Sequence, residues 1–78
     1  MLRLMNIVRN GNIVSAIVTI VEADPETFEI SVDIEKREII RNTRGKMDSY
    51  VSMARNKLID VALRSGKKLP KETVCVWY

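Results

Sequence analysis

Residues 28–34 alternate without interruption between apolar side chains at even positions and polar side chains at odd positions. A period of two places every second side chain on the same face, which is the pattern of a strand buried on one face only. The polar residues 35–37 then predict a turn, and residues 38–42 predict a short returning strand. This part of the chain therefore indicates an antiparallel hairpin with one apolar face.

A second hairpin is predicted at the beginning of the chain. Asn10-Gly11 is a strong signal for a type I′ turn, because both central residues of that turn need a positive φ. The turn would fold residues 2–8 back onto residues 13–22. Asp24-Pro25 then interrupts the strand pattern, since proline donates no backbone hydrogen bond.

After residues 43–46 the apolar period changes from two to three and four, which indicates one face of a helix. The residues that follow this spacing are Met47, Tyr50, Val51, Ala54, Leu58, Val61 and Ala62. Asp48 is a suitable N-cap, because its carboxylate can accept hydrogen bonds from the free N–H groups of the first turn. Gly66 suits the left-handed position after the helix, and Pro70 prevents the helix from continuing.

Residues 73–78 read as a last strand that reaches the end of the chain. The predicted fold class is α+β: a mostly antiparallel β-meander of three to four strands, one helix packed on one sheet face, then a C-terminal strand, in the order ββββαβ. With 78 residues, of which 46% are hydrophobic, the chain is expected to form a single domain over residues 1–78. The order of the strands in the sheet stays open.

The strand at residues 13–21 is apolar on both faces, unlike its neighbour. Its even positions are Val14, Ala16, Val18 and Ile20, and its odd positions are Ile13, Ser15, Ile17, Thr19 and Val21. A three-residue loop at 23–25 would place the even positions beside Phe28, Ile30 and Val32 in the core. A loop one residue longer would place the odd positions there, because a one-residue shift in register exchanges the faces. We favour the shorter loop, since Ser15 and Thr19 then face water.

With either register, a stripe of aliphatic side chains remains on the sheet face that the single helix cannot cover. Leaving several such side chains in water costs several kcal/mol, at about 1.5–3 kcal/mol for each fully buried one. One explanation is a homodimer or a protein partner that covers the stripe, with Ile13, Ile17, Val21 and Tyr78 as interface candidates. The other is a curled or bulged sheet on which the first strand or Arg3 folds over the stripe.

The net charge of +3 is distributed unevenly along the chain. Residues 1–35 carry two basic and six acidic side chains, a net charge of −4, whereas residues 36–78 carry eleven basic and four acidic ones, a net charge of +7. Nucleic-acid binding by the basic half is the alternative function. The candidate residues for it are Arg41, Arg44, Lys46, Lys67, Lys68 and Lys71. No phosphate-binding glycine loop or aromatic RNA-binding motif accompanies them, so we favour a solvated surface.

Histidine is absent and Cys75 is the single cysteine, which excludes Ser-His-Asp and Cys-His catalysis, Cys/His zinc sites and disulfide frameworks. Glu29 and Asp33 lie four residues apart on one strand, about 13 Å at the backbone, too far for an acid–base pair. We therefore expect no enzyme, cofactor or metal. The sequence indicates a mature intracellular, cytoplasmic chain without a membrane span, which acts as a small binding module through protein–protein contact or homodimerisation.

Overall fold

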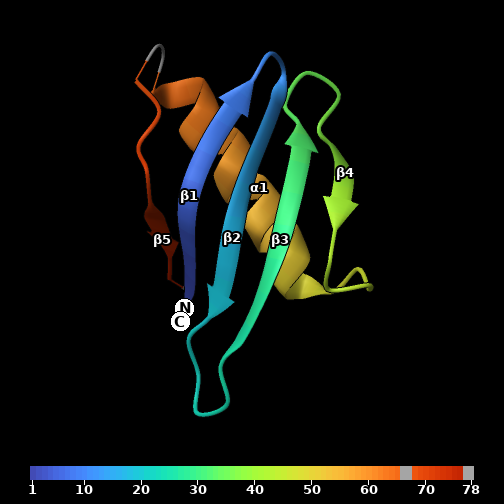
Figure 1. Cartoon of the computed structure of the whole chain (residues 1–78), viewed down its shortest axis with the longest axis vertical. Helices are drawn as coiled ribbons and strands as arrows, with labels where there is room; N and C mark the ends of the chain where they lie inside the picture. The colour runs from blue at the N-terminus through green and yellow to red at the C-terminus, as the bar shows by residue number, and fades with distance from the viewer. Residues whose placement is uncertain (66–67, 77–78) are drawn as a thin grey trace.

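The computed structural model describes residues 1–65 and 68–76, and confirms the predicted α+β order of four strands, a helix and a final strand (Figure 1). The elements are β1 (Leu2–Asn10), β2 (Ile13–Ile20), β3 (Glu26–Asp33), β4 (Glu38–Asn42), α1 (Ser49–Arg64) and β5 (Thr73–Cys75). Within the described ranges, no helix is long and apolar enough to cross a membrane.

The strands form one antiparallel sheet in the order β4-β3-β2-β1-β5. The first four strands follow the chain as a meander, and β5 joins the free side of β1 rather than that of β4. Helix α1 therefore carries the chain diagonally behind the sheet, from the β4 edge to the β5 edge (Figure 1). The last strand was predicted over residues 73–78, whereas β5 ends at Cys75 and Val76 is not in a strand. Residues 77–78 of the predicted strand lie outside the described residues.

The register between β2 and β3 confirms which face of β2 points inward, but the loop length was wrong. Residues 21–25 connect the two strands, two residues more than the predicted loop, and this shifts the pairing by two positions without exchanging the faces. Val14 pairs with Val32, Ala16 pairs with Ile30, and Val18 lies opposite Phe28. These side chains are buried, and they form the core together with Leu2, Leu4, Ile7, Ile20 and Ile34 from the strands and Val51, Ala54, Leu58, Ile59 and Ala62 from α1. The even positions of β2 thus face the helix, as the period-two pattern of β3 requires.

The first hairpin forms as predicted, but its turn differs in detail. The two residues between β1 and β2 are Gly11 and Asn12, and only Gly11 has a positive φ, of 63°. A two-residue turn with a positive φ at its first position is the type II′ pattern, in which glycine occupies that position. The glycine was identified correctly, whereas the turn begins one residue later than expected.

Strand β1 contains a bulge that redirects its side chains. Met5 pairs with Ile17 and Val8 pairs with Ser15, so two residues of β1 oppose one residue of β2. Asn6, one of these two residues, has a φ of 53°, a left-handed conformation that asparagine tolerates better than most residues. The bulge lets Ile7 enter the core, while Val8 turns to the opposite face and is 60% exposed.

The helix begins at the residue that the capping argument predicts. The Val51 backbone N–H donates a 3.1 Å hydrogen bond to Asp48 Oδ1, and Asp48 has an extended backbone. Met47 precedes this cap and is 62% exposed, so its assignment to the buried helical face was wrong.

At the C-terminal end of α1, the Ser65 N–H and hydroxyl donate to the Val61 carbonyl at 3.0 and 2.6 Å. Gly66, the expected residue after the helix, lies outside the described residues.

Candidate binding surface on the open sheet face

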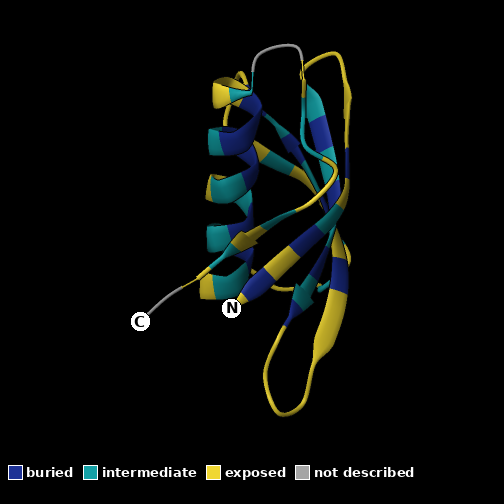
Figure 2. Cartoon of the chain, turned by 90° about the vertical axis from the view of Figure 1, so that its left-hand side faces the viewer, coloured by how far each residue is buried: buried dark blue, intermediate teal, exposed yellow. Residues whose placement is uncertain are grey.

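Figure 2 shows α1 on one side of the sheet and, among the described elements, none on the other side. We call this second side the open face. The strand pairing assigns to it Arg3, Met5, Val8, Asn10, Ile13, Ser15, Ile17, Thr19, Thr27, Glu29, Ser31, Asp33, Glu38, Arg41 and Val74. Neither the first strand nor Arg3 folds over it, because β1 lies beside β2 within the sheet and Arg3 reaches sideways to Glu72.

The open face is divided into an apolar and a polar half. Strands β5, β1 and β2 contribute the aliphatic side chains, which are Val74, Met5, Val8, Ile13 and Ile17. The residues that the pairing of β3 and β4 assigns to this face have only hydroxyl and charged side chains. Ile40, which is 57% exposed, lies at the register shift in β4, and the pairing assigns it to neither face. The apolar half is the stripe that the two-faced pattern of residues 13–21 predicts, extended onto β1 and β5.

The four interface candidates have different positions. Ile13 and Ile17 lie on the open face, where each is half-buried by its neighbours. Val21 is exposed just after β2, and its N–H donates to the Met1 carbonyl at 2.9 Å. Tyr78 lies outside the described residues. The structure therefore brings Ile13 and Ile17 together on one strand, and adds Met5 and Val8. Val8 was missed because the bulge at Asn6 was not recognised, whereas Met5 precedes the bulge and faces outward by alternation with the buried Leu4.

The hydroxyl groups of the open face bond to one another across the strands. Ser15 Oγ and Ser31 Oγ are 2.8 Å apart, and Thr19 Oγ1 and Thr27 Oγ1 are 3.3 Å apart. Each hydroxyl therefore has a partner within the sheet, which lowers the cost of removing it from water. A second layer could cover this part of the face without leaving these groups unsatisfied.

Two ion pairs lie on or beside the open face. Arg41 and Glu29 approach to 3.2 Å, and Arg3 and Glu72 to 3.8 Å. All four side chains are more than half exposed, and such pairs contribute only about 0–1 kcal/mol to stability. They neutralise charge on the face rather than hold the fold together.

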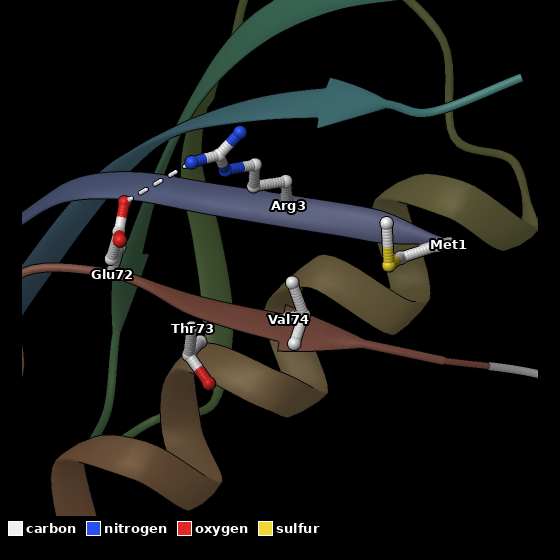
Figure 3. A pocket seen from close by; sticks show the side chains of 5 residues that line it. All are labelled: Met1, Arg3, Glu72, Thr73 and Val74. Carbon is white, nitrogen blue, oxygen red and sulfur yellow. Dashed lines mark ion pairs between the residues drawn. The ribbon is translucent and has the colours of Figure 1, made fainter.

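Two hollows on the surface of the described residues lie on or beside the open face. A depression of about 300 Å³ lies next to the bulge on the open face and is lined by Val8, Ser15, Ile17, Ser31 and Arg41, among others. A second hollow, of about 420 Å³, lies at the β1–β5 edge beside the ion pair of Arg3 (Figure 3). In the part of the chain that the structure describes, no three histidine, cysteine, aspartate or glutamate side chains gather to hold a metal ion.

The basic candidates are distributed over both ends of the molecule. Arg41 lies on the open face, and Arg44 and Lys46 lie in the segment between β4 and α1. Lys68 and Lys71 lie beyond the other end of α1, which is about 24 Å long at 1.5 Å per residue. Lys67 lies outside the described residues. The structure does not bring the described members together into one basic patch.

Arg44 has a structural role that its sequence position does not reveal. Its side chain is only 8% exposed, and its Nε donates to Asp48 Oδ2 at 2.9 Å while Nη1 donates to Glu26. The guanidinium lies 5.7 Å from the centroid of the Phe28 ring and 5.4 Å from that of Tyr50, both in cation–π range. Arg44 therefore joins the β2–β3 loop side of the sheet to the start of α1.

Charges in this cluster shift the pKa values of three groups. Desolvation alone would lower the pKa of Arg44, but its hydrogen bonds to Asp48 and Glu26 raise it above the ordinary value. Desolvation opposes ionisation of Asp48, yet the Val51 N–H and Arg44 hold the pKa of Asp48 below its usual 3.8. The Tyr50 hydroxyl donates to Glu22 at 2.7 Å, and this bond together with desolvation raises the pKa of Tyr50.

Cys75 lies on the helix side of the sheet, since it pairs with Leu2, and it packs partly buried against the core. The residue that Cys75 pairs with, Leu2, carries no charge that would activate the thiol.

No family model matches the chain, and neither the curated proteins nor the solved structures contain a significant match to it. The function of this chain is therefore inferred from the residues of the open face.

Proposed function

We propose that this chain is a small, non-catalytic binding module that acts through protein–protein contact on the open face. The observation that carries the proposal is the apolar half of that face, where Met5, Val8, Ile13, Ile17 and Val74 lie on adjacent strands without a covering layer. Contiguous apolar surface that is rimmed by polar residues is typical of interaction sites. A protein surface is the partner that could cover it over several strands at once.

The composition of the open face favours a protein over a nucleic acid. Its strand residues carry two arginines against Glu29, Asp33 and Glu38, so the face has no excess of positive charge to neutralise phosphates. The mixture of aliphatic, hydroxyl and paired charged groups resembles a non-obligate interface, which is about as apolar as an ordinary protein surface. The absence of a dominant charge therefore supports protein contact.

The test is the size of the native particle in an extract of cells that produce the chain. We expect the tagged wild-type chain to sediment as a complex clearly heavier than its own 8.9 kDa. Ile17→Asp, which places a charge at the centre of the apolar half, should return the chain to monomer size. Asn56→Asp is the matched control, because it adds the same charge on an exposed position of α1 and should leave the complex unchanged.

A wild-type chain that sediments at monomer size in the extract, with both variants indistinguishable from it, would overturn the proposal. The same conclusion would follow if Ile17→Asp and Asn56→Asp reduced the size of the complex equally. Circular dichroism of the purified variants shows whether each is folded, so that loss of the complex is not confused with unfolding.

A further inference from the structure

We infer that the partner of the open face is a second copy of this chain, packed face to face about a two-fold axis that passes over Ile17. This inference rests on the proposed function and specifies its partner. Three properties of the open face support a self-complementary contact: its area, its charge balance and the position of Ile17 within it.

The area of the open face suits a dimer of moderate size. Five strands about 4.8 Å apart, with the longer ones about eight residues at 3.3 Å each, give a projected area on the order of 500 Å². Side-chain relief makes the accessible area larger than this projection. A standard interface buries about 600–1,000 Å² on each partner, so the whole face, including its polar half, would have to take part.

The charge of the open face permits contact with an identical face. Its basic residues, Arg3 and Arg41, are already paired with Glu72 and Glu29, so two copies would not bring unpaired like charges together at these positions. The chain as a whole carries a net charge of +3, which would repel a second copy at other orientations. The other acidic residues of the face, Asp33 and Glu38, lie level with Ile13, four residues along β2 from Ile17. A two-fold axis over Ile17 therefore does not place either of them against its own equivalent.

Ile17 lies at the centre of the open face in both directions. Strand β2 is the middle strand of the order β4-β3-β2-β1-β5, and Ile17 lies near the middle of β2. Two identical faces that overlap fully must be related by an axis through their common centre, where a residue meets its own equivalent. Ile17 and Val8 both line the hollow next to the bulge, so the face offers a recess at its centre that side chains of a second copy can enter.

The axis position makes a charge-complementation experiment decisive. We expect the purified wild-type chain to sediment as a dimer at micromolar concentration, with about twice the 8.9 kDa chain mass. Ile17→Asp and Ile17→Lys should each be folded monomers, because each places two like charges at the axis. An equimolar mixture of the two variants should recover the dimer, since position 17 then pairs an aspartate with a lysine. This recovery should weaken in high salt.

Asn56→Asp and Asn56→Lys provide the control pair, and both should remain dimeric alone and when mixed. If either Ile17 variant fails to fold, Ile17→Thr replaces it, because threonine is β-branched and suits a strand. Ile17→Thr should weaken dimerisation more than tenfold without loss of the far-ultraviolet spectrum, since both copies lose apolar contact at the axis.

Three results would overturn the second-copy inference. The first is a purified wild-type chain that stays monomeric at about 100 µM, well above the concentration at which a micromolar interaction forms. The second is a dimer that tolerates both Ile17 variants. The third is a mixture of the two variant monomers that does not form a dimer. If the purified chain is monomeric but the extract still contains a heavier complex that Ile17→Asp removes, the proposed function stands and the partner is another protein. If that complex is also absent, both conclusions fall.

Discussion

The two faces of the same sheet have opposite relationships to the rest of the chain. On the helix side, Leu2, Leu4, Val14 and Val18 are fully buried against α1. On the open face, the neighbouring residues of the same strands are half-buried or exposed, and Ile17 is directly adjacent in sequence to Val18. Period-two alternation presents one set of side chains to each face. On β2 both sets contain aliphatic residues, whereas on β3 the outward set is polar.

The comparison shows that on β2 cover by the helix distinguishes the two faces, whereas on β3 the side-chain chemistry already does so. One 16-residue helix spans the sheet diagonally and can bury only the side on which it lies. The bulge at Asn6 increases the difference, because it directs Ile7 to the core and Val8 to the open face. The experiments below alter one face, or the attachment of the helix, and compare the response.

The largest expected effect comes from emptying the covered face. Leu4→Ala removes a fully buried side chain and leaves a cavity, so we expect the free energy of unfolding to fall by about 2–5 kcal/mol. Met5→Ala, at the next position and on the open face, should lower the free energy of unfolding clearly less than Leu4→Ala does. Both variants are measured at a concentration low enough for the chain to be monomeric. Urea denaturation followed by circular dichroism measures both. Equal losses would show that the open face is as well packed as the core.

A smaller loss is expected when the attachment of the helix is weakened at Arg44. Arg44→Gln keeps a polar side chain but removes the ion pairs to Glu26 and Asp48 and the stacking on Phe28. The thermal unfolding midpoint should fall by a few degrees. Arg41→Gln on the open face removes an exposed ion pair and should leave the midpoint nearly unchanged. A midpoint that is equally insensitive to both would refute a structural role for Arg44.

A third effect, comparable with that of Arg44→Gln, is expected at the helix N-cap. Asp48→Ala should lower the free energy of unfolding by about 0.5–2 kcal/mol at neutral pH. Folding lowers the pKa of Asp48. The stability that Asp48 contributes is therefore fully present above its pKa in the unfolded chain, about 3.8, and is lost as the pH falls through its lower pKa in the folded chain. Wild-type and variant stabilities should therefore converge below pH 3.8, as measured by urea titrations across the acid range.

Asp60→Ala is the control for this acid limb, because Asp60 forms an exposed ion pair with Arg64 on the same helix. Asp60→Ala should lower the free energy of unfolding by about 0.2–0.5 kcal/mol, as is usual for an ion pair four residues apart on a helix. If the wild-type chain remained more stable than Asp48→Ala by the same free energy of unfolding at low pH, the ionised Asp48 carboxylate would not be the group that stabilises the helix start.

Local patterns made several features predictable from sequence. The alternation around Ile30 and Val32 established both a strand and its buried face, and the preference for Ser15 in water selected the observed inward face of β2. The exact register, set by a five-residue connection, was not predicted. Asp48 was identifiable as the cap because the chemistry of a helix start is local. Met47 was misassigned because helical spacing continues past a boundary that only the capping geometry defines.

Other features depend on residues that are distant along the chain. Arg44 was grouped with basic surface residues, whereas its partner Glu26 is 18 positions away and its aromatic neighbours lie on β3 and α1. The bulge in β1 has no composition signal beyond an asparagine, and it determines whether Val8 belongs to the core. The candidate surface could therefore be located on β2 from sequence but not extended to β1 and β5.

By itself, the amino-acid sequence determined where strands and helix form and which side of β2 faces inward, because those properties follow from side-chain period, turn residues and capping groups within a few positions. Tertiary structure alone decided that β5 pairs with β1, that Arg44 is enclosed by Glu26 and Asp48, and that the open face gathers side chains from three strands. These arrangements depend on long-range packing, in which segments far apart in sequence compete for the same neighbours.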